Sequence, residues 1–368
     1  MSPMTNHDKL LAVYQNQRPD GVPVGIYSKQ LPRGYEERLC REKGLCLIDY
    51  YPITSMMGPP YRMGPGFLSE VNGGQFTVRY TWHDGQPLEI RTCQTRVGTV
   101  SQHVRKDPMY GSDWVIKDYI ETPEDYKIMQ FLIENSVIRS NEKAFRNKVK
   151  DMGDDGIILG RVDRSPFQKL LIELANPQTF LMDILTGLNE AEELLGAMTQ
   201  KFDQMCVFIA ETSAEIIWQT ENLSGDMTPP DMYRKYCLPL YNTLTASFDR
   251  QKKPFIVHTD GRMKPLLDVI AQSPIDGCES YSYPEMGNDI TFTQARQAWP
   301  KKVLLPNFPA SLAHESAETI REFMAQKLQE AGTEKAYMIQ FSEDLPLNLQ
   351  NQTLDIVLDF VNEYNRNH

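Results

Sequence analysis

Residues 255–281, FIVHTDGRMKPLLDVIAQSPIDGCESY, contain the pattern that decides the fold. A short apolar, β-branched run, Phe255–Asp260, is followed by a stretch typical of a helix and then by a second apolar run, Ile275–Tyr281. Two strands joined by a helix lie parallel in one sheet, because the helix carries the chain back to the edge where the first strand began. The stretch therefore predicts one repeat of an alternating α/β fold.

The same alternation continues on both sides of this unit. Six further runs have the composition of buried strands: Val22–Tyr27, Leu45–Tyr50, Gly156–Val162, Glu215–Glu221, Val303–Phe308 and Ala336–Ser342. Helical stretches follow nearly all of them, among them 177–210, TPPDMYRKYCLPLYNTL at 228–244 and a closing helix at Thr353–Tyr364. Eight strands are what a closed (β/α)₈ TIM barrel needs, and this is the fold class that we predict. The alternative fold, an open doubly wound sheet, would require a glycine-rich phosphate loop after its first strand. The sequence YSKQLPRG at 27–34 is not such a loop.

An insertion interrupts the alternation after the second unit. Phe76–Trp82, Leu88–Gln94 and Thr99–Arg105 alternate apolar and polar residues, and the turn sequence HDGQ separates the first two. We therefore expect an antiparallel β-meander, inserted at about 67–110 into a single TIM-barrel domain of residues 1–368. A helix should follow from the capping sequence TPEDY at Thr122.

The composition excludes several classes of function. The chain of 368 residues has a formal net charge of −11, whereas nucleic acids and anionic membranes require clustered lysine and arginine. No apolar run is long enough to span a bilayer, and the polar start Met1–Leu11 does not have the apolar segment of a secretory signal. Six scattered cysteines without a CxxC pair are typical of reduced thiols. We expect a cytoplasmic protein that binds neither nucleic acid nor membrane; its oligomeric state, a homodimer included, stays open.

Polar residues lie at the ends of the predicted strands, where barrel enzymes carry their catalytic groups. The candidate catalytic side chains are Asn222, Asp260 and Glu279, and Asn307 is a candidate for substrate binding. Because side chains alternate along a strand, His258 and Asp260 should face the same side. We therefore expect Asp260 to orient the imidazole of His258.

Glu221, Cys237 and His258 form the candidate metal site. Carboxylate, thiolate and imidazole are ligands that zinc prefers, and three protein ligands leave a fourth position open in a catalytic site. Glu221 and His258 end adjacent strands, whereas Cys237 lies in the helix between them, where a buried apolar cysteine fits equally well. The structural alternatives are an ion pair or helix cap for Glu221 and a hydrogen bond to Asp260 for His258. Glu279 is a further candidate ligand or general base.

The stretch ITSMMGPPYRMGPG, after the second strand, is rich in methionine, proline and glycine. We predict that it folds over the barrel mouth, with Met56, Met57 and Tyr61 contacting a flat aromatic substrate beside Trp218 and Phe341. Packing of the stretch against the meander is the alternative.

Several stretches resemble a known family. HTDGRMKPLLDVIAQSPIDGCES at 258–280, followed by a proline and GND, and ARQAWPKKVLLPNFPAS at 295–311 are similar to the uroporphyrinogen decarboxylase superfamily, and LLAVYQNQRPDGVPVGIY at 10–27 fits its first strand. The corrinoid-dependent methyltransferases of aryl methyl ether O-demethylases resemble the chain most, because their zinc motif has the order of Glu221, Cys237 and His258. Enzymes of this superfamily that act on methanol or thiols have His-x-Cys where this chain has His258-x-Asp260.

The resemblance implies a TIM barrel and a zinc-dependent methyltransferase. A methyl group would pass from a phenyl methyl ether of guaiacol or vanillate type to the Co(I) corrinoid (cobalamin) of a partner protein, since the chain has no cobalamin-binding DxHxxG motif. SKQLPRGY at 28–35 replaces the arginine cluster by which the decarboxylases hold a polycarboxylate. Two alternatives stay open: a metal-free lyase for a small carboxylic acid, using Glu279, Asp260 and Arg161, and a non-catalytic corrinoid- or folate-binding barrel.

Overall fold

Eight parallel strands form one curled sheet in the computed structural model, which describes residues 3–59, 69–106, 113–332 and 336–368. Their order is β11-β10-β9-β8-β7-β2-β1-β12. The strands are β1 (Val24–Tyr27), β2 (Leu45–Pro52), β7 (Gly156–Val162), β8 (Ile217–Leu223), β9 (Phe255–Thr259), β10 (Gly277–Tyr281), β11 (Val303–Pro306) and β12 (Ile339–Phe341). The two ends of the sheet meet in one parallel bridge between Asn307 and Gln340, where the N–H of Phe308 donates to the carbonyl of Gln340 at 2.7 Å. The arrangement is TIM-barrel-like, as predicted.

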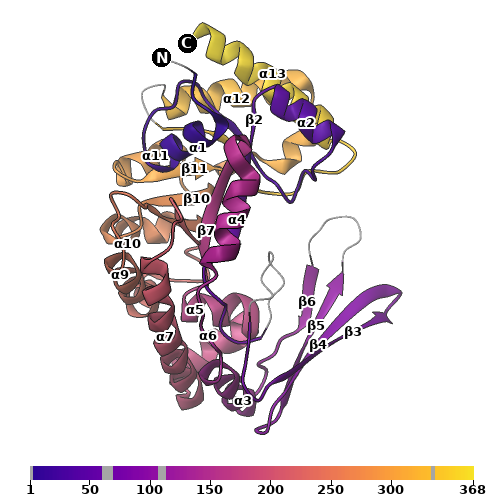
Figure 1. Ribbon diagram of the computed structural model, residues 1–368, viewed down its shortest axis with the longest axis vertical. Coiled ribbons are helices and arrows are strands. Elements are labelled where there is room, and N and C mark those ends of the chain that lie inside the picture. Colours follow the sequence, from indigo (N-terminus) through magenta and orange to yellow (C-terminus); the bar gives the residue numbers. More distant parts are fainter. Residues whose placement is uncertain (1–2, 60–68, 107–112, 333–335) are drawn as a thin grey trace.

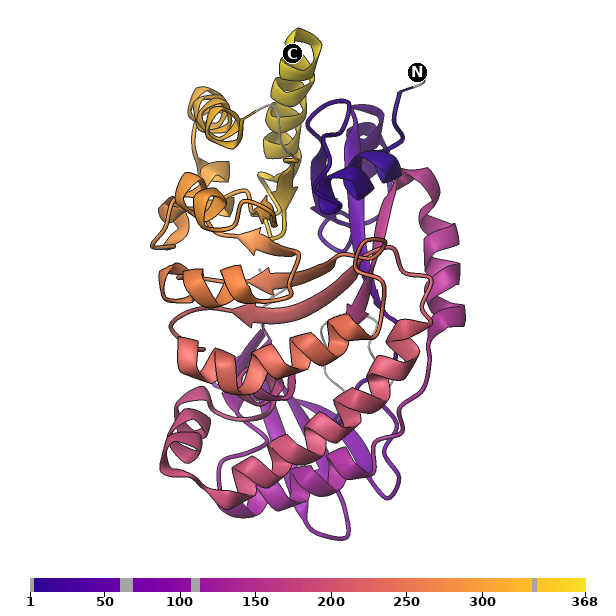
Figure 2. The same ribbon diagram turned by 90° about the vertical axis from the view of Figure 1, so that its left-hand side faces the viewer.

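Helices surround this sheet (Figures 1 and 2), and α1 (Asn6–Tyr14) is the described helix whose residues pack with the interior of the curl. The helices are α1, α2 (Tyr35–Glu42), α3 (Pro123–Glu134), α4 (Glu142–Met152), α5 (Pro166–Lys169), α6 (Pro177–Thr186), α7 (Asn189–Ala210), α8 (Pro230–Met232), α9 (Leu238–Ala246), α10 (Leu267–Gln272), α11 (Phe292–Ala298), α12 (Ala317–Ala331) and α13 (Gln350–Asn367), with π-helical turns η2 (Leu170–Leu174) and η3 (Tyr233–Cys237). The predicted capping box at Thr122 is present, with Asp125 as its second member. The predicted helical stretch 177–210 is two helices, because Gly187 takes a left-handed conformation with φ of 73° and ends α6. No helix among the described residues is both long and apolar enough to cross a membrane.

Alternate residues of each strand face opposite layers of the core. Tyr27, Tyr50, Trp218 and Ile256 belong to a cluster inside the curl, which also includes residues of α1. Their neighbours along the strands, such as Ile217, belong to the larger cluster beneath the outer helices. The face on which a strand residue lies therefore decides whether its side chain reaches the interior of the barrel.

A second sheet projects from the barrel (Figure 1). It contains four antiparallel strands in sequence order, β3 (Gln75–His83), β4 (Gln86–Gln94), β5 (Thr99–Lys106) and β6 (Asp113–Lys117). Asp84 and Gly85 form the first turn with positive φ angles of 51° and 74°, the conformation that two-residue hairpin loops require. The insertion of three strands was predicted, but β6 was not. Four of its five residues are exposed, so its sequence has no alternation of buried and exposed positions to reveal it.

Candidate active site

A cavity of about 600 Å³ opens at the carboxyl ends of strands β9 to β12. Its lining comes from the loops after these strands and from one residue of β6 in the second sheet: Asp260, Ser282, Glu285, Met286, Pro309, Ala310, Ser311, Glu343, Asp344 and Trp114. This is the end of the barrel at which enzymes of this architecture place their active sites. Four of the lining residues are carboxylates with exposed side chains, so the cavity carries a negative field.

His258 and Glu279 form a hydrogen-bonded pair beside this cavity. They lie opposite each other on the neighbouring strands β9 and β10, and Nδ1 of His258 is 2.6 Å from Oε2 of Glu279. The side chain of His258 is 12% exposed and that of Glu279 is fully buried. Because an ionised carboxylate can only accept hydrogen bonds, Nδ1–H donates, and Nε2 is the nitrogen that remains for a substrate. Asp260 and Glu343, which line the cavity, also act on the charge of His258.

Three further donors converge on the carboxylate of Glu279. The hydroxyl of Tyr27 donates to Oε1 at 2.6 Å, Nε1–H of Trp218 donates to Oε2 at 3.1 Å, and Nε2 of Gln340 also donates to Oε1. Burial opposes ionisation of Glu279, but the charge of His258 and the hydrogen bonds from these partners outweigh it, so the pKa of Glu279 is lowered. The carboxylate is therefore held ionised inside the barrel.

The charge of Glu279 in turn acts on His258. Burial lowers the pKa of His258, but the attraction and hydrogen bond of Glu279, followed by the charges of Asp260 and Glu343, raise it above its usual value. The predicted orienting residue, Asp260, is thus replaced by Glu279 in the structure. The reason is that β9 ends at Thr259, so the alternation that would place Asp260 beside His258 does not continue. Asp260 instead lies 3.5 Å from Nδ2 of Asn222.

An aromatic wall lines the barrel interior next to the pair. The rings of Tyr50 and Trp218 stack with centroids 4.7 Å apart, and the ring of Tyr27 meets Tyr50 edge-on at 5.5 Å. Trp218 also meets the imidazole of His258 edge-on, at 6.0 Å. Arg161 on β7 lies 5.7 Å from the centroid of the Tyr50 ring. The predicted substrate residue Trp218 is therefore part of the same constellation as the predicted residues His258 and Glu279.

The structure brings two of the three predicted zinc ligands together, Glu221 and Cys237, and separates the third, His258, from them. Glu221 lies on the outer face of β8, where its carboxylate accepts from the N–H and the hydroxyl of Ser165 at 2.7 Å each. Cys237 is close to Glu221 and buried in the outer core, and burial followed by the charge of Glu221 raises its pKa. His258 faces the interior, on the other side of the sheet. Among residues 3–59, 69–106, 113–332 and 336–368, no group of three His, Cys, Asp or Glu side chains is arranged to hold a metal ion.

The remaining predicted residues have mainly structural contacts. Asn222 takes a left-handed conformation with φ of 48° and accepts from Arg164 at 2.9 Å. Asn307 accepts from the N–H of Ser342 at 3.0 Å where the barrel closes. Phe341 faces outward and packs on Phe308 with centroids 4.7 Å apart, so it does not lie beside Trp218 as predicted. The cause is again strand alternation: Gln340, its neighbour, is the β12 residue that faces the interior.

Both methionines of the predicted lid are buried. The exposed fraction of Met56 is 5% and that of Met57 is 0%, and the N–H of Met57 donates to Asp163 at 3.0 Å. Met57 belongs to the outer core cluster. Tyr61 lies outside the described residues. Contact of this segment with a substrate remains a prediction.

Tyr27 and Gln340, which donate to Glu279, are among the site residues that were not predicted. Both lie in strands that were correctly located, and Gln340 is a lone amide within the apolar run YMIQF. A buried polar side chain in a strand needs a partner, so this amide was the available signal. Nothing in the sequence indicates that its partner is Glu279, 61 residues away.

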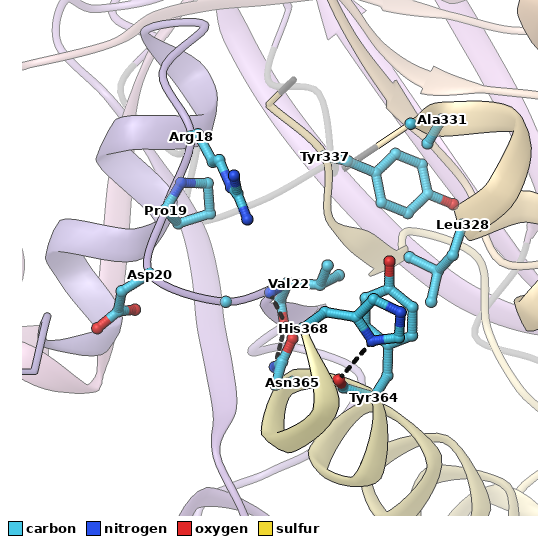
Figure 3. A pocket seen from close by; sticks show the side chains of 12 residues that line it. Arg18, Pro19, Asp20, Val22, Leu328, Ala331, Tyr337, Tyr364, Asn365 and His368 are labelled. Carbon is cyan, nitrogen blue, oxygen red and sulfur yellow. Dashed lines mark hydrogen bonds between the residues drawn. The ribbon is translucent and has the colours of Figure 1, made fainter. Parts of the chain in front are cut away.

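A second cavity, of about 190 Å³, has the lining side chains drawn in Figure 3, and it lies at the opposite end of the barrel, where β1 and β12 begin. Arg18, Val22 and Tyr337 line it together with Tyr364 and His368 of α13 and its end. The imidazole of His368 stacks on the ring of Tyr364 with centroids 4.2 Å apart. Because it lies at the amino ends of the strands, this cavity is not the expected place for catalysis.

Known proteins that are similar to this chain include one solved structure of the same fold. No curated protein sequence matches the chain. Among solved structures, a methyltransferase from Methanosarcina mazei is similar, with 15% sequence identity, a TM-score of 0.54 and coverage of 98% of this chain and 99% of the other. A B12-independent methionine synthase from Shewanella sp. W3-18-1 aligns with 81% of this chain and 77% of its own, at 11% identity and a TM-score of 0.42. A model of the family described as uroporphyrinogen decarboxylase (URO-D) matches residues 133–364, which is more than half of the chain. The chain therefore belongs to the uroporphyrinogen decarboxylase family.

Proposed function

We propose that this chain is a methyltransferase that removes the methyl group of a phenyl methyl ether, of guaiacol or vanillate type, and passes it to the Co(I) corrinoid of a partner protein. The observation that carries the proposal is the pair of His258 and Glu279 beside the cavity, in which a buried carboxylate holds a histidine by Nδ1 and leaves Nε2 for the substrate. The stacked rings of Tyr50 and Trp218 are buried behind His258 and are not among the described residues that line the cavity, so they support the imidazole from the barrel interior.

The chemistry needs an acid because a phenolate is a poor leaving group. The methyl carbon is attacked by the reduced cobalt, the carbon–oxygen bond breaks, and its electron pair stays on the phenolic oxygen. Protonated His258 delivers the proton from Nε2 to that oxygen, and a phenol leaves. Glu279 stabilises the positive imidazole before the transfer, which its lowered pKa permits.

The predicted zinc ion has no assigned part in these steps, because Glu221 and His258 lie on opposite faces of the sheet. A polycarboxylate substrate is disfavoured by the four carboxylates of the cavity, Asp260, Glu285, Glu343 and Asp344. This observation favours the methyl ether over a decarboxylation substrate with many acidic groups.

The test is methyl transfer from guaiacol to chemically reduced cobalamin, followed by the release of catechol. His258→Ala should lower kcat by about 10²- to 10⁴-fold, the usual contribution of a general acid. Glu279→Gln should lower kcat less and shift the alkaline limb of the pH profile to lower pH, because the imidazole loses its anionic partner and gives up its proton more readily. His368→Ala, at the opposite end of the barrel, is the matched control and should keep full activity.

Two results would contradict this mechanism. One is unchanged activity of His258→Ala. The other is complete loss of wild-type activity on treatment with a chelator and its return with zinc, which would make His258 a metal ligand in place of an acid. Release of CO₂ from a carboxylic acid, without any transfer of methyl groups, would favour the lyase alternative.

A further inference from the structure

The outer edge of the second sheet has unpaired strand hydrogen-bonding groups and exposed apolar side chains. Within the part of the chain that the structure describes, β3 (Gln75–His83) pairs only with β4. Val78, Tyr80 and Trp82 are 54%, 70% and 71% exposed, and their spacing places all three on one face of the strand. Figure 1 shows β3 at the side of the sheet away from the barrel.

Such an edge is normally protected against association. Proteins shield edge strands with lysine, proline, inward-pointing charges or a bulge. β3 contains no lysine, proline or acidic residue, and its pairing with β4 runs without a bulge over all nine residues. Arg79 is the one permanently charged residue of β3, and the opposite face carries the exposed side chains of Val78, Tyr80 and Trp82, so this long and regular edge is a template for another strand.

We infer that β3 pairs with β3 of a second copy of this chain, antiparallel about a two-fold axis at Tyr80, so that the two sheets become one of eight strands. In this register Tyr80 lies opposite itself, and Val78 of each copy lies opposite Trp82 of the other. Aromatic–aromatic and aromatic–β-branched pairs are among the cross-strand pairs that stabilise sheets.

Neighbouring registers are less favourable because of charge. An axis at Arg79 would place this guanidinium opposite its own copy. An axis at Thr81 would place Arg79 opposite His83. The axis at Tyr80 places Arg79 opposite Thr81, so no cations face each other directly, and like charges directly opposite destabilise a sheet.

The charge of this edge fits a second copy. Two chains of net charge −11 repel each other over most of their surfaces, but β3 has no acidic residue. Pairing edge to edge covers the strand edge and the flanks of Val78, Tyr80 and Trp82, on the order of a few hundred Å² per copy. This area is typical of a weak association, so the dimer should depend on protein concentration.

Sedimentation of the full chain over a range of concentrations tests the association. We expect a dimer for the wild type and a dissociation constant at least about tenfold higher for Tyr80→Lys, which places two ammonium groups at the axis. Leu347→Lys is the matched control, because Leu347 is 75% exposed and lies outside the second sheet. Circular dichroism should show the same fold for both variants, since both side chains are exposed. A monomeric wild type, or a dimer that Tyr80→Lys leaves intact, would overturn the inference.

A disulfide experiment tests the register. All six native cysteines are buried, so an engineered thiol is the one that a mild oxidant reaches first. Tyr80→Cys should form an intermolecular disulfide, because Cβ atoms directly opposite in an antiparallel pair are about 4.5–5.5 Å apart. Trp82→Cys should not form one, because position 82 of one copy lies opposite Val78 of the other, and the two positions 82 are four residues apart along the ladder, at roughly 13 Å. A cross-link through Trp82→Cys, or through Arg79→Cys, with none through Tyr80→Cys, would refute this register.

Discussion

At the scale of single residues, burial decides the charge of Glu221. Its carboxyl accepts two hydrogen bonds from Ser165, but burial raises its pKa from 4.5 to about 7. The folded pKa lies above the unfolded one, so the contribution of this group to stability is complete below about pH 4.5 and is lost as the pH rises through 7. We expect the free energy of unfolding of the wild type to lose up to about 3 kcal/mol from this group between pH 4.5 and pH 8. Glu221→Gln should abolish that loss.

Urea unfolding of both proteins at several pH values measures this effect. Glu322→Gln, an exposed position on α12, is the control and should keep the wild-type pH dependence. Equal slopes for wild type and Glu221→Gln would mean that Glu221 is ionised in the folded protein at pH 6.

At the scale of elements, a buried ion network fixes the end of β7 to α5 and η2. Nζ of Lys169 lies 2.8 Å from Asp163 and 2.9 Å from Glu173, and Nε of Arg164 donates to Glu173 at 2.7 Å. All four side chains are 1% exposed. Lys169→Met would leave buried carboxylates without one of their cations and should lower the free energy of unfolding by about 3–5 kcal/mol. Chemical denaturation measures the loss.

A double variant separates charge from packing in this network. Lys169→Met combined with Glu173→Gln should recover part of the lost stability, because the amide carries no uncompensated charge. Lys252→Met is the exposed control and should change little. A double variant no more stable than Lys169→Met would contradict the electrostatic explanation.

At the scale of the whole molecule, the charge of the cavity should select among substrates. Asp260, Glu285, Glu343 and Asp344 repel an anionic ring such as vanillate but not neutral guaiacol. Raising the ionic strength should lower KM for vanillate by about threefold, equivalent to about 0.6 kcal/mol between exposed charges, and leave KM for guaiacol unchanged. Glu343→Gln should lower KM for vanillate at low salt. Initial rates in 0.05 and 0.5 M salt check both statements, and equal salt effects on the two substrates would contradict them.

The sequence was sufficient to predict the barrel-like sheet of eight parallel strands, whereas the position of its site stays a prediction. Each of the eight strands was located within a few residues. A buried parallel strand has a continuous apolar run, whereas a helix on the surface of the barrel has apolar residues only at every third or fourth position. His258 and Glu279 were recognised as functional candidates since they end such strands. The short exposed strand β6 carries no such pattern and was missed.

The sequence by itself determined which residues lie at the carboxyl ends of the barrel strands. Only the tertiary structure decided which of them meet. Strand alternation fixes the face of each residue relative to its neighbours, but the absolute face depends on the register and tilt of the whole sheet. For this reason Glu221 and His258, which end adjacent strands, lie on opposite faces, whereas His258 and Glu279 share one. The four donors around Glu279 come from β1, β8, β9 and β12, and only closure of the sheet brings these strands around one carboxylate.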